Sequence, residues 1–200
     1  ELWFVLVANP VGYQYTFDHE RLWRRNLRDN NGDGRTQVGD GVDPNRNFPD
    51  HWGYDEEGSS SIQSSETYRG PAPLSEPETQ AVPAYVRSLW PDRRGPLPTD
   101  AAPADTSGIH LDIHSYSQLV LWPWGTTATP APNGAALQTL GRRFAWFNGY
   151  TPQQSIGLYA TDGTSDGVSY GELGVAAYTI ELGTSFFQSC TDYTNTIQPN

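Results

Sequence analysis

The stretch Ile109-His110-Leu111-Asp112-Ile113-His114-Ser115-Tyr116-Ser117-Gln118-Leu119-Val120-Leu121-Trp122 decides the fold, because it holds two apolar segments on either side of a polar loop. The aliphatic and β-branched content of residues 109–114 and 119–122 predicts two strands. Residues 176–182, Ala-Ala-Tyr-Thr-Ile-Glu-Leu, have the same character and predict another buried strand. The continuous apolar run at residues 2–7 predicts a further strand, covered on both faces.

Helices are expected between these strands. Ser75 and Glu78 have the spacing of a capping box and predict a helix over about 76–89. Apolar residues recur at helical spacing within 135–147, and a shorter helix is expected over 165–173. The apolar positions of the 135–147 helix are Leu137, Leu140, Phe144 and Phe147.

The order of these elements predicts an α/β fold with a central mixed, mostly parallel sheet flanked by helices. Residues 8–74 are expected to be mainly irregular, since they are rich in Gly, Asp, Asn and Ser. In open α/β sheets ligands bind beyond the ends of the strands. Functional residues are therefore expected in the loops that follow the predicted strands.

Composition limits the classes of partner. The 200 residues are expected to form one domain, and the net charge of −11 argues against nucleic acid and anionic membranes as partners. No apolar run has the length of a membrane span, and the single Cys190 cannot form an intrachain disulfide. The 20 Gly and 16 Pro residues indicate a loop-rich chain, and loops on a rigid scaffold often carry binding and catalytic groups.

Three segments carry a resemblance to a known family. They are Val42-Asp43-Pro44-Asn45-Arg46-Asn47-Phe48, His114-Ser115-Tyr116-Ser117-Gln118 and Tyr178-Thr179-Ile180-Glu181-Leu182. Supporting matches lie at residues 9–13, 21–26, 65–71 and 75–79, and at Tyr159 before 163–165. In this order, over nearly the whole chain, the segments resemble the zinc carboxypeptidases of the A/B type.

The resemblance implies one catalytic zinc ion, with His114 as the family's third zinc ligand. The family's first two ligands lie in an upstream His-x-x-Glu segment, and no such segment occurs in this sequence. Residues 1–200 are therefore expected to be the C-terminal part of a catalytic domain, incomplete at the N-terminal side. A rival site would use His110, Asp112 and His114, which alternate on one strand face but lie about 7 Å apart at their Cα atoms.

The resemblance also implies two catalytic residues. Glu181 matches the general base, which accepts the proton of the water that zinc activates and passes it to the leaving amine. Arg24 matches the arginine that polarises the scissile carbonyl. The neighbouring Arg21, Arg25 and Arg28 have no such match and are expected to be solvated surface charges.

Substrate-binding residues follow from the same resemblance. Asn45 and Arg46 match the pair that holds the substrate's terminal carboxylate, a task that suits a guanidinium group. Tyr159 matches the mobile tyrosine over the bound C-terminal residue, and Tyr116 is assigned to substrate binding. Asp166 matches the floor of the specificity pocket and implies acceptance of peptides that end in Lys or Arg. The alternative for Asp166 is a cap at the start of the following helix.

A separate motif predicts calcium binding. Asp29, Asn31, Asp33 and Asp40 occupy positions 1, 3, 5 and 12 of a loop with Gly34 at position 6, as in EF-hand loops, except that Asp replaces the final Glu. The alternative is an acidic insertion that is rich in turns.

The expected function is that of a secreted zinc metallocarboxypeptidase, which hydrolyses the C-terminal peptide bond of peptides or proteins. Three alternatives remain: a non-catalytic homologue that binds peptides or glycans, a calcium-stabilised binding module, and a zinc peptidase with amidase activity. The Asn45-Arg46 pair argues against the amidase. Extracellular location is expected from the resemblance, the absence of Lys and the loop similar to a calcium site.

Overall fold

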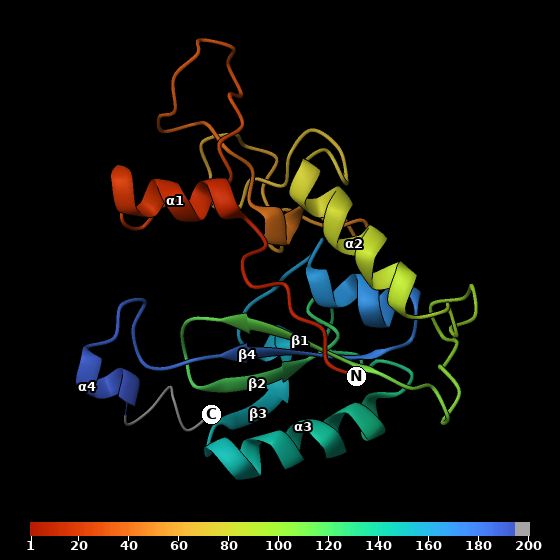
Figure 1. Ribbon diagram of the computed structural model, residues 1–200. Coiled ribbons are helices and arrows are strands. Elements are labelled where there is room, and N and C mark those ends of the chain that lie inside the picture. Colours follow the sequence, from red (N-terminus) through yellow and green to blue (C-terminus); the bar gives the residue numbers. More distant parts are fainter. Residues whose placement is uncertain (195–200) are drawn as a thin grey trace. The chain divides into compact units, whose positions relative to one another are not determined.

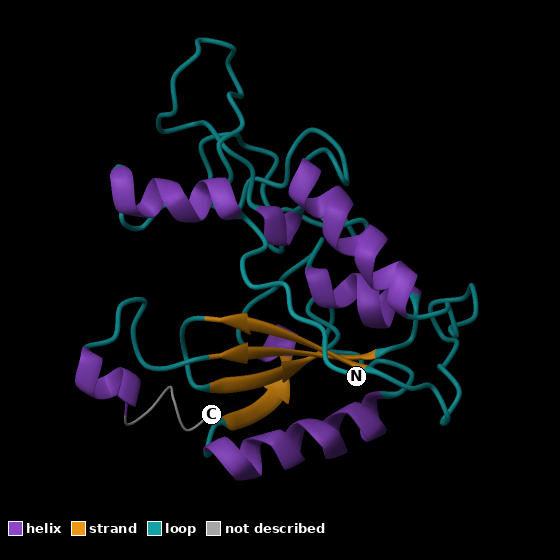
Figure 2. Ribbon diagram, viewed as in Figure 1, coloured by secondary structure: helices purple, strands orange, loops and turns teal. Residues whose placement is uncertain are grey.

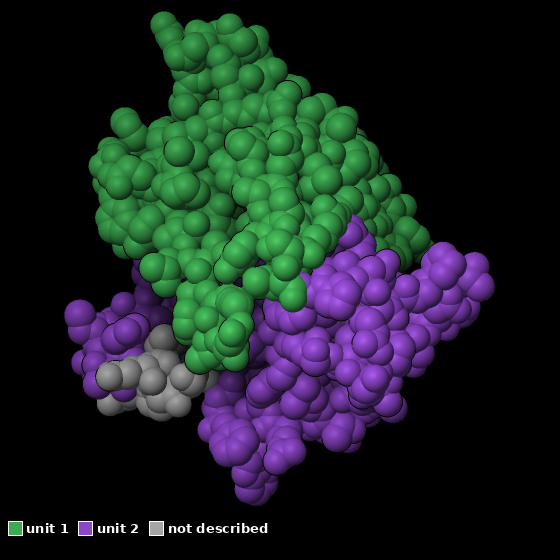
Figure 3. Space-filling model, turned by 45° about the vertical axis from the view of Figure 1, so that its right-hand side comes forward, with its two compact units in different colours: residues 1–89, 161–164 green, residues 90–160, 165–200 purple. Residues whose placement is uncertain are grey.

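The computed structural model describes residues 1–194, which form two compact units. The first unit comprises Glu1–Leu89 with Thr161–Thr164, and the second comprises Trp90–Ala160 with the chain from Ser165 onward. Figure 3 colours the two units separately. The prediction of one partial catalytic domain over residues 1–200 stays a prediction.

The second unit is built on a four-stranded sheet with the order β1-β4-β2-β3 (Figure 1). The strands are β1 (Ile109–His114), β2 (Leu119–Trp122), β3 (Thr151–Gln154) and β4 (Ala176–Glu181). β1 pairs with β4 and β2 with β3 in parallel, while β2 and β4 are antiparallel. The predicted mixed, mostly parallel α/β sheet is confirmed.

Helix α3 (Gly134–Asn148) covers one face of this sheet and closes the apolar core (Figure 1). Leu137, Gly141 and Ala145 are buried along it, and the Tyr178 hydroxyl of β4 donates to the Leu137 carbonyl at 2.9 Å. Phe147, although it is one of the apolar residues at helical spacing, is 80% exposed and does not belong to this core. At 3.6 residues per turn, Phe147 lies about 120° around the helix from Gly141, outside the buried stripe.

Strand β1 is an edge strand, and its apolar face is partly open. Ile109, Leu111 and Ile113 are exposed, whereas the register places them beside Ala176, Tyr178 and Ile180 of the buried β4. The predicted strand at residues 2–7 is wrong: this segment forms no strand, and its apolar side chains are exposed. A buried strand needs neighbours that cover both faces, and no described strand pairs with residues 2–7.

The first unit contains two α-helices and long loops (Figure 2). Helix α1 (Pro10–Asp18) lies where irregular chain is expected; the Asn9 side chain accepts from the Gly12 amide, and Pro10 occupies the first turn, so Asn-Pro is its starting signal. Helix α2 (Pro77–Leu89) was predicted and continues through Pro83. Within residues 1–194, no helix is both long and apolar enough to cross a membrane.

Candidate functional site

His114 and Glu181 lie side by side at the carboxyl ends of two parallel strands. The register pairs His114 of β1 with Glu181 of β4, and neighbouring strands are about 4.8 Å apart. Because side chains alternate along a strand, Glu181 lies on the face opposite Tyr178 and Ile180, away from α3. Glu181 is 7% exposed and the His114 side chain is 25% exposed, so a buried carboxylate and a partly buried imidazole occupy adjacent strand ends.

Asp112 completes a polar row with His114 on the same face of β1. Its Oδ2 lies 3.0 Å from His114 Nε2 and also accepts from the Ser165 hydroxyl. Burial would raise the pKa of Asp112, but the charge and hydrogen bond of His114 and the hydrogen bond from Ser165 outweigh burial and hold the pKa well below its usual range. Asp112 is therefore an anion at neutral pH.

The rival metal site on β1 does not form. His110 Nδ1 is hydrogen-bonded to Ser169 Oγ at 2.8 Å, while His114 is paired with Asp112. Within residues 1–194, the only group of three acidic, His or Cys residues with ligand atoms within 4.8 Å of one another lies elsewhere, in the loop 29–40. His110 is thus a hydrogen-bond partner of Ser169.

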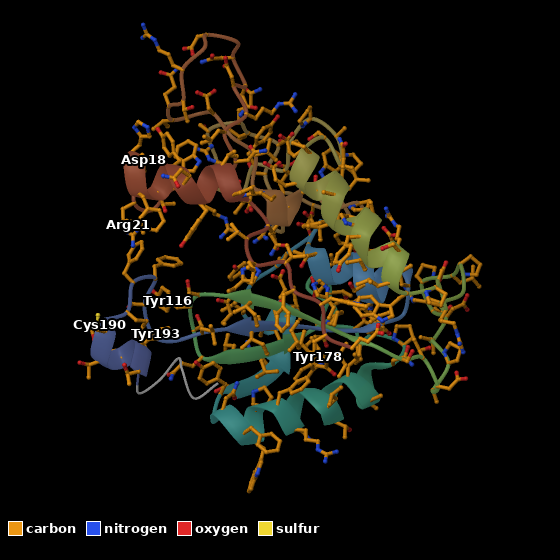
Figure 4. All side chains as sticks on the ribbon, in the orientation of Figure 1. Asp18, Arg21, Tyr116, Tyr178, Cys190 and Tyr193 are labelled. Atoms are coloured by element: carbon orange, nitrogen blue, oxygen red, sulfur yellow. The ribbon has the colours of Figure 1, made fainter. Side chains whose placement is uncertain are left out.

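Three other predicted residues, Tyr116, Tyr159 and Asp166, belong to this unit. Tyr116, in the loop after β1 (Figure 4), makes an edge-on contact with Phe186, with ring centroids 4.8 Å apart. Tyr159 is 51% exposed. Asp166 is buried at the start of η3 (Gly167–Glu172), and its side chain forms no capping hydrogen bond to that helix. Asp166 thus occupies the N-cap position of η3 without a side-chain capping hydrogen bond, and both interpretations of this residue stay predictions.

In the first unit, a buried aspartate connects the predicted arginine and asparagine. Asp43 Oδ2 accepts from Arg24 Nε and Nη2, both at 2.8 Å, and Asp43 Oδ1 accepts from the backbone N–H of Asn45 at 3.0 Å. Asp43 also starts the short helix η1 (Pro44–Arg46). Arg24, Asn45 and Arg46 are therefore brought together within this unit.

Arg46 is almost completely buried and is only partly satisfied. Its Nη1 donates to the Asn45 carbonyl at 2.6 Å, whereas its Nε has no hydrogen-bond partner among the described residues. Buried polar groups are normally hydrogen-bonded, and a guanidinium group pairs well with a carboxylate. Arg46 therefore has unused capacity to bind an anion.

Sequence reasoning missed Asn47, which anchors the turn behind Arg46. Its side-chain Nδ2 donates to the carbonyls of Arg69 and Ala72 at 2.7 and 2.8 Å, and its Oδ1 accepts from Thr79 Oγ1 at 2.6 Å. Asn47 is fully buried. The only signal in the sequence is its place in the Asn-Arg-Asn motif, because its partners lie 22 to 32 residues further along the chain.

The prediction that Arg25 is a solvated surface charge is wrong. Its side chain is 1% exposed, and Nη1 donates to the carbonyls of Gln63 and Ser65 at 3.0 and 3.3 Å. The guanidinium also lies over the Trp23 ring, 5.0 Å from the centroid. Through these hydrogen bonds Arg25 links its own segment, which precedes η1, to the loop 63–65.

The loop 29–40 folds around its acidic side chains. Asp29 accepts from the amides of Gly32 and Gly34, both at 2.7 Å, and these backbone hydrogen bonds, that of Gly34 foremost, lower the pKa of Asp29. Asp29, Asp33 and Asp40 bring carboxylate oxygens within 4.8 Å of one another. Asn31 lies among them, with its Oδ1 accepting from the Asp33 amide. The flanking helices of an EF-hand are absent from the described residues 19–43.

Comparison with known proteins identifies the family. A profile described as zinc carboxypeptidase matches residues 1–199. The chain belongs to the zinc carboxypeptidase family. It is 36% identical over 193 residues to zinc carboxypeptidase A 1 of Anopheles gambiae, covering 90% of this chain and 39% of the relative. It is also 36% identical over 182 residues to carboxypeptidase B of Astacus astacus, covering 87% of this chain and 54% of the relative.

Solved structures agree with this family assignment. Bovine thrombin-activatable fibrinolysis inhibitor, in complex with tick carboxypeptidase inhibitor, superposes with a TM-score of 0.77 at 26% identity, over 96% of this chain and 63% of that chain. Carboxypeptidase A from Helicoverpa armigera gives a TM-score of 0.74 at 27% identity, over 96% of this chain and 46% of that chain. The chain thus spans less than two thirds of the length of these relatives.

The family implies zinc, and the residues present fit one part of a zinc site. A neutral imidazole is a common zinc ligand, and a carboxylate on the ligand's second nitrogen is a typical supporting group. His114 with Asp112 meets both conditions. A complete site requires ligands that residues 1–194 do not gather around His114.

Proposed function

We propose that the protein is a metallocarboxypeptidase that removes the C-terminal residue of peptides or proteins, with zinc held in part by His114 and with Glu181 as general base. The observation that carries this proposal is the register pairing of His114 with Glu181 at the carboxyl ends of β1 and β4. The zinc ion that His114 would help to hold and the Glu181 carboxylate must both reach one water molecule, and adjacent strand ends suit that requirement.

Each residue has a distinct chemical task in this proposal. Zinc, when bound, supplies Lewis acidity that makes water more acidic and polarises the scissile carbonyl. Glu181 takes the proton of the attacking water and later gives it to the leaving amine. Its burial keeps bulk water away from the carboxylate and so favours proton transfer to and from the substrate. Arg24 stabilises the negative charge that develops on the carbonyl oxygen.

Arg46 and Asn45 are proposed to bind the free terminal carboxylate of the substrate. Support comes from the buried guanidinium group of Arg46, whose Nε has no partner within the described chain. A substrate carboxylate would supply the missing acceptor, and this requirement favours exopeptidase over amidase or endopeptidase activity. Tyr159 is proposed to cover the bound residue, and Tyr116 with Phe186 to contact the preceding part of the peptide.

Asp166 is proposed to select basic C-terminal residues. Asp166 places a buried carboxylate at the start of η3, and a negative charge in such a position attracts the cation that a substrate Lys or Arg would offer. The lack of a capping hydrogen bond from Asp166 to η3 supports this role.

We also propose that the protein is secreted and that Asp29, Asn31, Asp33 and Asp40 bind calcium. The three carboxylates that approach within 4.8 Å support the calcium site. Calcium would neutralise their mutual repulsion and stabilise the loop. A non-catalytic homologue that binds peptides or glycans is the second candidate function, but the retained Glu181 and arginines favour the enzyme.

The test of the enzyme proposal is Glu181→Gln in the protein that carries the complete catalytic domain. Loss of the general base should lower kcat about 10²- to 10⁴-fold while KM changes much less, because the base acts in the transition state. Steady-state kinetics on a peptide with a free C-terminus measure both constants. Normal turnover by this variant would exclude Glu181 as the base. If the unsubstituted protein with the complete catalytic domain is inactive but binds the peptide tightly, the non-catalytic homologue is favoured.

A further inference from the structure

Strand β1 carries two histidines in different environments on one face. His114 Nε2 faces Asp112 Oδ2 at 3.0 Å, whereas His110 Nδ1 is hydrogen-bonded to Ser169 at 2.8 Å. The zinc role proposed for His114 makes its contact with Asp112 important, because a carboxylate on the ring can control how the ring presents itself to a metal. This carboxylate is partly buried and touches the imidazole directly.

We propose that Asp112 is a positioning residue that fixes the tautomer and orientation of the His114 ring for zinc. The inference deepens the proposed function and rests on His114 being a zinc ligand. Asp112 would not touch substrate or metal itself. Its role is to keep one ring nitrogen protonated, so that the other nitrogen presents its lone pair.

The chemistry of imidazole supports this assignment. A neutral ring has one N–H donor and one acceptor nitrogen, and a carboxylate accepts but does not donate. Contact with Asp112 therefore favours the tautomer with the proton on Nε2 and the lone pair on Nδ1. A carboxylate that binds the ligand's second nitrogen also makes the first nitrogen a better donor to metal.

The carboxylate of Asp112 is itself held in place. The Ser165 hydroxyl donates to the same Oδ2 atom from the turn before η3. Asp112 and His114 are two residues apart on a strand, so the backbone of β1 directs both side chains to one face. The ring is thus oriented by a neighbour that has little freedom to move.

The experiment compares variants of the protein with the complete catalytic domain. Zinc affinity is measured by competition with a fluorescent chelator at fixed pH, and kcat and KM are measured at saturating zinc. Asp112→Ala should weaken zinc binding about 10- to 100-fold. Asp112→Asn should have a smaller effect, because its amide oxygen can still accept from Nε2. Ser169→Ala, which removes the partner of His110 on the same strand face, should leave zinc affinity unchanged.

Two further measurements separate positioning from a structural role. Circular dichroism checks that each variant is folded, and long-range ¹H–¹⁵N correlation of the metal-free protein reports the His114 tautomer, which should change in Asp112→Ala. Unchanged zinc affinity and tautomer in a folded Asp112→Ala protein would overturn the inference, provided that His114→Ala weakens zinc binding. If His114→Ala leaves zinc binding intact, the proposed function fails at this residue and the inference fails with it.

Discussion

Gly163 approaches the backbone of Arg46 more closely than any side chain would permit. Its φ is +59°, and a Cβ atom added there would lie 2.5 Å from the Arg46 carbonyl oxygen and 2.9 Å from the carbonyl carbon. Both groups belong to the first unit, and the Gly163 carbonyl accepts from the Phe48 amide at 2.9 Å. Gly163→Ala should therefore displace the turn that presents Arg46.

The expected loss of stability has two sources. The left-handed conformation costs an L-residue roughly 1–2 kcal/mol. Forcing a methyl group against backbone atoms costs about 1–3 kcal/mol more, since neither chain segment can yield without moving its hydrogen bonds. Urea unfolding should therefore show a decrease of about 2–5 kcal/mol in the free energy of unfolding, with an unchanged slope.

Gly53→Ala is the matched control in the same unit. Gly53 has a φ of +65°, but the three atoms nearest to its added Cβ all belong to the flexible Arg69 side chain, at 3.3 to 3.7 Å. This variant should lose only the conformational part, about 1–2 kcal/mol. Equal destabilisation of the two variants would refute the steric argument. A rise of KM in Gly163→Ala alone would connect the displacement to substrate binding by Arg46.

Three other predictions concern specificity, calcium and pH. Asp166→Ala should lower kcat/KM for a peptide that ends in Arg about 10-fold or more relative to matched peptides that end in Leu or Phe. If the unsubstituted protein with the complete catalytic domain does not cleave the Arg peptide, basic specificity is rejected. Calcium added to chelator-treated protein should raise Tm, and substitution of Asp33 by Ala should abolish the increase; a flat titration would exclude the site in loop 29–40. Because burial raises the pKa of Tyr178 in the folded protein, folding retains its proton, so stability should fall by up to about 1.4 kcal/mol per pH unit above about pH 10. Tyr178→Phe should make that decline less steep in thermal melts.

The elements with a strong local pattern could be predicted from the sequence. The strands 109–114, 119–122 and 176–181 and the helix α3 all carry it. β3 could not be predicted, because Thr151-Pro152-Gln153-Gln154 has no apolar alternation and becomes a strand only by pairing with β2. The strand predicted at residues 2–7 was wrong for the opposite reason: its apolar pattern is typical of a buried strand, but no partner strand pairs with it among the described residues.

The candidate site depended on family resemblance rather than on periodicity. No property of Glu181 or His114 alone indicates that they are neighbours; the register of β1 against β4 places them together. The buried contacts of Arg25 and Asn47 likewise join residues that are distant along the chain. A single sequence indicates which side chains have suitable chemistry, whereas long-range pairing decides which of them meet.

The position of β1 has a consequence for handling the 200-residue chain. Its outer edge pairs with no described strand, and its exposed Ile109, Leu111 and Ile113 form an apolar row. Open edges of this kind are templates for intermolecular pairing and aggregation. The opposite edge is protected, because Pro152 of β3 cannot donate a backbone hydrogen bond. Fibril-like self-association of concentrated protein should therefore begin at β1, and Leu111→Lys should slow it.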